Sequence, residues 1–256
     1  MYFQNYKKLL DVLTILRKKF YLYGIKAEYE AEGSSNHDIN LLRSITLKAK
    51  TKIFVKIGGV EAINDIYNCL EIGVDGIIAP MVESEFGVYK FIEFFKNKNL
   101  SSKPYLTINI ETRKGYESLD KILPLCKGLI DNITIGRSDF SASYFKKEII
   151  PDSKFITDKI IRIAEKAKKF GITTTVGGSV SKKTIASYKK KPMLIKNLKN
   201  LETRKVILPI RKFINNKNAI DYAIKFESLY ILLKNEISEF KLLNEKNRLT
   251  ILNTRK

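Results

Sequence analysis

The stretch YLTINIETRKGYESL (residues 105–119) decides the fold, because an alternating, β-branched run ends in a charged Glu-Thr-Arg and a helix-like segment follows. The stretch NITIGRSDFSAS (residues 132–143) has the same form, with an apolar strand that ends at Gly136 and Asp139 shortly after it. Repeated strand–helix units with short junctions predict neighbouring parallel strands. Glu111 and Asp139 are therefore expected at the carboxyl ends of adjacent strands.

The same alternation of strand-like and helix-like segments extends along most of the chain. In addition to the two strands quoted above, we expect strands in GIKAEYEAEG (24–33), KIFVKIGG (52–59), VDGIIAPMVES (74–84), ITTTVGGSVS (172–181) and ETRKVILP (202–209). Helical patterns fill the intervals. An amphipathic helix is expected over residues 1–20, and a long helix at about 219–243.

So many strand–helix units in 256 residues predict a (β/α)8 barrel with an N-terminal helix and an extended C-terminal helix. We expect one domain over residues 1–256, because no linker or internal repeat divides the chain. The eighth strand is unassigned, and the segment 187–200 is a candidate for it. An open doubly wound sheet is the alternative, but no GxGxxG motif follows the first strand.

The composition argues against several classes of protein. Hydrophobic residues make up 44% of the chain, which is too apolar for a disordered protein. The formal net charge of +20 favours anionic partners, but no RNP motif, zinc finger or basic heptad region accompanies it. Nucleic acid is therefore not the expected ligand. No apolar run approaches about 18 residues, so membrane insertion is not expected either.

The cysteines and the histidine argue against further kinds of site. Cys69 and Cys126 stand apart in the sequence without a CxxC motif, which argues against a disulfide framework or a zinc site and favours a cytoplasmic location. Residues 1–20 lack the features of a signal peptide. His37 is the only histidine, and no nucleophile elbow accompanies it, so a Ser-His-Asp triad is not expected.

Catalytic groups of such barrels project from the carboxyl ends of the strands. The polar, charged and glycine residues at those ends are Glu30, Glu32, Lys56, Gly58, Gly59, Glu83, Glu111, Arg113, Gly136, Arg137, Ser138, Asp139, Gly177, Gly178 and Arg204. Alternation places Glu28, Glu30 and Glu32 on one face of the first strand. Buried carboxylates there need cationic partners, for which Lys26 and Arg204 are candidates. Glu32 lies nearest the mouth and is the candidate for a catalytic role.

These strand ends resemble those of the HpcH/HpaI aldolase and citrate lyase family. The segments that carry the resemblance are KAEYEAEG, KIGGVEAINDIY, GVDGIIAPMVES, NIET, IGRSDFSAS, ETRKVILP and AIDYAIKFESLY, which together cover about residues 24–245. The resemblance implies a metal-dependent barrel enzyme that acts on pyruvate-like keto acids or acyl-CoA thioesters, with Glu111 and Asp139 as ligands of Mg²⁺ or Mn²⁺. Lys56 stands where the family has a carboxylate-binding arginine. The family's histidine base has no counterpart, and Glu28, Glu30 or Glu32 is a candidate to replace it.

The chemistry of the residues is consistent with this implication. Splitting a carbon–carbon bond next to pyruvate requires a stabilised enolate, which a hard cation on carboxylate ligands supplies. The alternative for Glu111 and Asp139 is that they only cap helices. Backbone N–H groups at Gly136 and Ser138 are candidates to hold the substrate carboxylate. Arg137 is a candidate catalytic group, or it points to solvent or a partner subunit.

Lys56 has three candidate roles. It can contact the substrate anion, pair with one of the glutamates, or form a Schiff base as in a metal-free aldolase. Gly58 and Gly59 beside it permit close approach of the backbone to a ligand, so we expect both in the substrate site. Arg204 is a further candidate substrate contact.

The late helix carries apolar residues on more than one stripe, which predicts a partner subunit, and members of the resembled family often exchange C-terminal helices between subunits. The expected protein is a homo-oligomeric, class II-type lyase that works through a metal-stabilised enolate of a keto acid. The alternatives are a CoA-thioester lyase of the citryl-CoA or malyl-CoA kind and a non-catalytic barrel that binds an anionic ligand.

Overall fold

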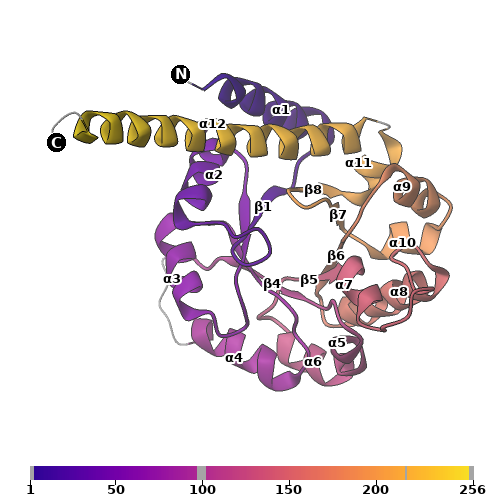
Figure 1. Cartoon of the computed structure of the whole chain (residues 1–256). Coiled ribbons are helices and arrows are strands. Elements are labelled where there is room, and N and C mark those ends of the chain that lie inside the picture. Colours follow the sequence, from indigo (N-terminus) through magenta and orange to yellow (C-terminus); the bar gives the residue numbers. More distant parts are fainter. Residues whose placement is uncertain (1–2, 97–101, 217, 254–256) are drawn as a thin grey trace.

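Eight strands close into a barrel in the order of the sequence, and helices surround it (Figure 1). The computed structural model describes residues 3–96, 102–216 and 218–253. The strands are β1 Gly24–Glu28, β2 Ile53–Lys56, β3 Gly76–Ala79, β4 Tyr105–Asn109, β5 Asn132–Gly136, β6 Thr173–Gly177, β7 Asn200–Glu202 and β8 Val206–Pro209. The expected α/β barrel, with its N-terminal helix and long C-terminal helix, is confirmed.

The helices pack their apolar stripes against the outer face of the barrel. They are α1 Gln4–Phe20, α2 Asn36–Lys48, α3 Ile63–Ile72, α4 Glu85–Lys96, α5 Arg113–Glu117, α6 Leu119–Cys126, α7 Arg137–Ala142, α8 Lys154–Lys169, α9 Lys182–Lys189, α10 Pro192–Asn197, α11 Ile210–Asn215 and α12 Ala219–Asn253. In α8, Ile156, Ile160 and Ile163 recur at helical spacing and are fully buried. None of the helices of the described residues is both long and apolar enough to cross a membrane.

One part of the barrel differs from the all-parallel sheet that the sequence predicts. Strands β1 to β7 pair in parallel, but β8 runs antiparallel to both β7 and β1. The segment 187–200 forms the end of α9, α10 and the first residue of β7, so it is not the eighth strand. The run ETRKVILP contains the end of β7, a tight turn and β8. This turn, at residues 203–205, therefore lies at the same barrel end as the carboxyl ends of the parallel strands.

The interior of the barrel changes in character along its axis. At the amino ends of the strands, Phe54 stacks on Tyr23 with ring centroids 5.5 Å apart, and its ring occupies the space that side chains at Gly24 and Gly76 would fill. Above this plug, Asn132 and neighbouring threonines form buried hydrogen bonds, such as the 3.1 Å bond that Thr175 donates to Asn132. Charged side chains occupy the carboxyl end. The apolar plug closes one end, so the polar end is the one open to a ligand.

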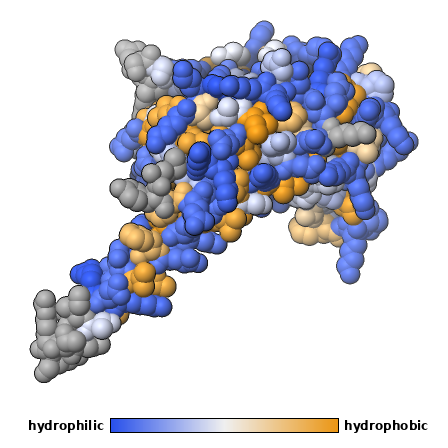
Figure 2. All heavy atoms as spheres, turned by 90° about the horizontal axis from the view of Figure 1, so that it is seen from above, coloured by the Kyte–Doolittle hydropathy of each residue, from blue (hydrophilic) through white to orange (hydrophobic). Residues whose placement is uncertain are grey.

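Helix α12 lies beside α1 and then continues past the barrel (Figures 1 and 2). Asn5 of α1 donates a 2.6 Å hydrogen bond to Glu236 of α12, and the rings of Phe3 and Phe240 meet edge to face. Beyond Phe240 the residues of α12 up to Thr250 are all exposed. The structure thus ends in a helical arm with apolar side chains on its surface (Figure 2).

Candidate active site

A cavity of about 450 Å³ opens at the carboxyl ends of the parallel strands. Its charged lining residues are Lys26, Glu28, Lys56, Glu111, Asp139, Glu202, Arg204 and Glu227. Asn109, Gly136, Ser138 and Gly178 also line it. The three cationic and five carboxylate side chains give the cavity a formal net charge of minus two, although the formal net charge of the whole chain is +20.

Glu111 follows β4 and is buried at the wall of this cavity. The backbone N–H of Met81 donates to Oε1 at 3.0 Å, and the side-chain amide of Asn109 donates to Oε2 at 3.1 Å. Burial raises the pKa of Glu111; Lys56 and the Met81 N–H oppose this shift, and the Asp139 carboxylate adds to it. Glu111 and Asp139 therefore lie close enough to influence each other, as their positions on adjacent strand ends predict.

Two glycines make room for carboxylates from the neighbouring strands. A Cβ at Gly136 would lie 2.4 Å from Oε2 of Glu111, and one at Gly177 would lie 2.7 Å from Oε1 of Glu202. Gly136 and Gly177 are partners in the β5–β6 register. Both glycines therefore leave space for a carboxylate of the site, and Gly136 also lines the cavity.

A buried network of ion pairs forms the floor of the cavity. Nζ of Lys26 lies 2.7 Å from Oε1 of Glu202 and 3.1 Å from Oε1 of Glu28, and Nζ of Lys56 lies 3.1 Å from Oε2 of Glu28. Burial would raise the pKa of Glu28, but the two ammonium groups outweigh it and lower that pKa to about 2. For Lys26, burial would lower the pKa, but Glu202 and Glu28 raise it above its ordinary value. The ion pair with Glu28 holds Nζ of Lys56 at the floor of the cavity.

Six of the ten residues to which the sequence assigns a catalytic, substrate-binding or metal-binding role meet in this cavity. Lys56, Glu111, Gly136, Ser138, Asp139 and Arg204 all line it. Gly58 and Gly59 instead lie in a separate surface depression with Glu30 and Asp65, where the Gly58 N–H donates to Asp65 at 2.7 Å. Glu32 does not line the cavity, because its carboxylate forms a buried ion pair with Lys205.

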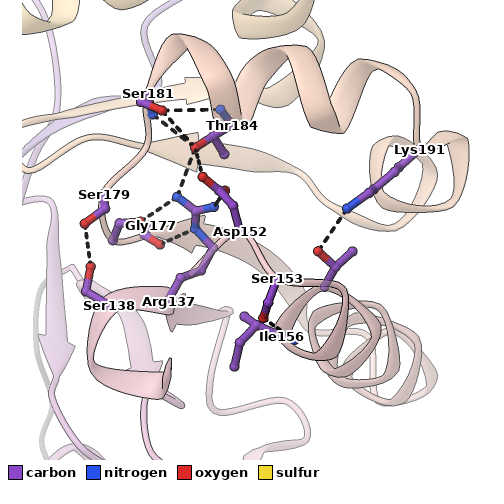
Figure 3. A network of polar contacts seen from close by, with 12 residues as sticks. Arg137, Ser138, Asp152, Ser153, Ile156, Gly177, Ser179, Ser181, Thr184 and Lys191 are labelled. Carbon is purple, nitrogen blue, oxygen red and sulfur yellow. Dashed lines mark hydrogen bonds and ion pairs between the residues drawn. The ribbon is translucent and has the colours of Figure 1, made fainter. Parts of the chain in front are cut away.

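Arg137 does not lie where a catalytic group of this cavity would. Its side chain is fully buried, with Nε donating to the Gly177 carbonyl at 3.1 Å and Nη2 to the Gly178 carbonyl at 2.6 Å (Figure 3). Asp152 accepts a further hydrogen bond from Nη1. The expected catalytic role of Arg137 is therefore corrected to a structural one. Its guanidinium holds Gly177, the last residue of β6, and Gly178 after it against the start of α7.

Several lining residues were not predicted from the sequence. Asn109 precedes Glu111 by two residues and shares its strand face, so alternation could have identified it. Glu202 was missed because β7 and β8 were read as a single strand. Glu227 belongs to α12, a helix whose pattern indicated only a subunit contact.

The carboxylates of the cavity fit a hard divalent cation. The described residues contain no cluster of three or more His, Cys, Asp or Glu side chains placed to hold a metal ion. A cation here would therefore have two protein ligands, Glu111 and Asp139, and its remaining positions would be left to water and substrate, as Mg²⁺ sites often do. Each oxygen of Glu111 accepts one hydrogen bond and keeps a free lone pair. A divalent cation would also neutralise the net charge of the lining.

Comparisons with known proteins identify the family and the fold. A family model described as HpcH/HpaI aldolase/citrate lyase matches residues 37–187, more than half of the chain. An HpcH/HpaI aldolase from Desulfitobacterium hafniense DCB-2 has a similar structure, with 18% identity over 76% of this chain and 81% of that chain and a TM-score of 0.60. The citrate synthase SbnG gives 16% identity over 93% of this chain and 90% of that chain, also with a TM-score of 0.60. At these identities, the structural matches establish the fold alone. The search of curated protein sequences found no significant match.

Proposed function

The chain belongs to the HpcH/HpaI aldolase/citrate lyase family, and from this premise we propose that it is a divalent-metal-dependent carbon–carbon lyase for a pyruvate-derived 2-keto acid. The observation that carries the proposal is that the carboxylates of Glu111 and Asp139 lie close together in a cavity whose side chains have a formal net charge of minus two. Such a cavity would repel an anionic keto acid unless a cation is bound with it.

Each lining residue has a proposed task. Glu111 and Asp139 would hold Mg²⁺ or Mn²⁺, which when bound withdraws electron density from the keto acid and stabilises its enolate. Lys56 lies at the end of β2 and would attract the substrate carboxylate as a point charge. Ser138 and Gly136 form the wall beside Asp139, and Arg204, exposed at the β7–β8 turn, would contact a second anionic group of the substrate.

Exchange of the methyl protons of pyruvate tests this function without knowledge of the aldehyde partner. In D₂O with Mg²⁺, proton NMR should show loss of the methyl signal at a rate that depends on the protein and the metal. The variants Glu111→Gln and Asp139→Asn should abolish the enzymatic exchange while remaining folded. The proposal would be contradicted if the folded wild-type protein catalysed no exchange of pyruvate methyl protons in the presence of either Mg²⁺ or Mn²⁺.

We further propose that the protein is a homo-oligomer that uses the arm of α12. Leu242, Leu243 and Leu249 are each more than half exposed and follow Phe240, whose ring meets that of Phe3. Large apolar side chains grouped on a helix that projects from the body are typical of a protein–protein contact, and a second copy of the chain would cover them.

A further inference from the structure

We propose that Glu227 of α12 is the group that transfers protons to and from the substrate in this cavity. This assignment rests on the lyase function proposed above and names a proton-transfer group for that reaction. Glu227 lines the cavity and is half-buried, so it has access to both ligand and solvent. It belongs to α12, outside the barrel, whereas Glu111 and Asp139 follow the carboxyl ends of barrel strands β4 and β5.

The other carboxylates of the cavity are already committed. Both oxygens of Glu28 form ion pairs with lysines. Oε1 of Glu202 accepts a hydrogen bond from Lys26, and its Oε2 has no hydrogen-bond partner but is buried away from solvent. Glu111 and Asp139 are assigned to the cation. A proton-transfer group must be able to change its charge state during the reaction, and a carboxylate fixed between ammonium groups cannot do so readily.

Glu227, in contrast, makes no hydrogen bond or ion pair with any other residue that the structure describes. The charged groups that act on it are Lys205 and Arg204 from the β7–β8 turn, Glu32 after β1 and Lys26 on β1. Burial raises its pKa, and Lys205 and Arg204 only partly oppose that shift. His37 is exposed on α2 and does not line the cavity, so it cannot take this role.

The proposed steps balance in protons and electrons. In cleavage, the Glu227 carboxylate removes the proton of the substrate's C4 hydroxyl. The electrons of that O–H bond form the aldehyde carbonyl as the C3–C4 bond breaks. The electron pair of the broken C3–C4 bond remains on the keto-acid fragment, which becomes an enolate. Protonated Glu227 then returns the proton to C3, which gives the methyl group of pyruvate. The reverse of this last step is the methyl-proton exchange of pyruvate.

The variant Glu227→Gln separates proton transfer from ligand binding. We expect the rate of pyruvate methyl exchange to fall by about 10²–10⁴-fold, while stabilisation of the protein by oxalate with Mn²⁺ stays at the wild-type level. Glu239→Gln is the matched control, because Glu239 is exposed farther along the same helix, and it should exchange at the wild-type rate. In the metal-free protein, carbon NMR of glutamate labelled at Cδ should show a resonance that titrates above the ordinary range and is missing from Glu227→Gln.

The outcomes distinguish this assignment from the proposed function itself. If Glu227→Gln exchanges protons at the wild-type rate, the assignment is wrong although the lyase function stands. If the variant loses oxalate binding as well as exchange, Glu227 belongs to the ligand-binding set and is not a dedicated proton-transfer group. If the wild type neither binds oxalate nor exchanges protons, the lyase function fails and this assignment fails with it.

Discussion

At the residue scale, the floor of the cavity depends on buried ion pairs between lysines and carboxylates. Lys26 lies between Glu28 and Glu202 in the barrel interior, and all three side chains are buried. A buried ion pair contributes little compared with apolar packing, but removing one partner leaves an uncompensated charge. The stability of this buried network therefore depends on Lys26, Glu28 and Glu202 all being present.

The variant Lys26→Met should lower the free energy of unfolding at pH 7 by about 3–5 kcal/mol, as measured by urea denaturation. The pH dependence follows from Glu28, whose pKa of about 2 lies below the ordinary value of about 4.3. A lowered carboxyl pKa contributes stability that is present above the ordinary pKa and is lost as the pH falls through 4 toward 2. The difference in free energy of unfolding between wild type and Lys26→Met should therefore be smaller at pH 3 than at pH 7.

Lys225→Met is the control for this prediction, because Lys225 is exposed on α12 and its loss should change the free energy by no more than about 0.5 kcal/mol. An equal loss of stability in Lys26→Met at pH 7 and pH 3 would contradict the role given to Glu28.

Residues at strand ends were largely predictable from the sequence, and residues placed by tertiary contacts were not. Glu111, Asp139 and Lys56 follow from the rule that barrel enzymes use the carboxyl ends of strands. Arg137 follows the same rule, yet its long side chain reaches away from the cavity to the carbonyls of Gly177 and Gly178. Spacing along the chain gives the position of a backbone atom, but not the direction of a long, flexible side chain.

At the scale of elements, the hairpin that closes the barrel was not predictable from periodicity. β7 has three residues and β8 has four, and the turn between them contains no Gly or Pro. Because no helix separates them, the run ETRKVILP reads as one strand. The closure has a functional consequence, since this turn brings Arg204 to the cavity and Lys205 close to Glu227.

The pairing of β4 with β5 gives a prediction at the same scale. Gly136→Ala should weaken Mn²⁺ binding by about 10–100-fold, because the new Cβ would displace the Glu111 carboxylate that lies 2.4 Å from its position. Isothermal titration calorimetry measures the affinity. Gly87→Ala in α4 is the control, because its nearest neighbour would lie 3.5 Å away. Unchanged Mn²⁺ affinity in Gly136→Ala would show that Glu111 does not hold the cation.

At the scale of the whole molecule, the arm of α12 predicts the assembly state. Replacing Leu242, Leu243 and Leu249 by Ser should reduce the molar mass measured by light scattering from that of an oligomer toward 29.5 kDa, without unfolding the barrel. The paired control Asn244→Ser and Asn247→Ser changes exposed polar residues of the same arm and should leave the mass unchanged. A wild-type protein that is already monomeric would contradict the proposed contact.

The charge of the molecule and the charge of its cavity have opposite signs. The net charge of +20 attracts anions to the molecule from a distance, whereas the five carboxylates of the cavity outnumber its three cationic side chains. A ligand that combines an anionic keto acid with a divalent metal satisfies both conditions. Overall charge therefore indicated an anionic partner from the sequence, and only the structure showed where the charge reverses.

The most direct measurement is a thermal-shift titration with oxalate, a planar mimic of the pyruvate enolate, with and without Mn²⁺. At concentrations near 100 times the dissociation constant, binding should stabilise the wild type by about 2.7 kcal/mol, or about 5–10 °C in melting temperature. We expect this shift only with Mn²⁺ present, and we expect Glu111→Gln and Asp139→Asn to lose it. A folded wild type that does not respond to oxalate and Mn²⁺ together would contradict the metal-dependent lyase site.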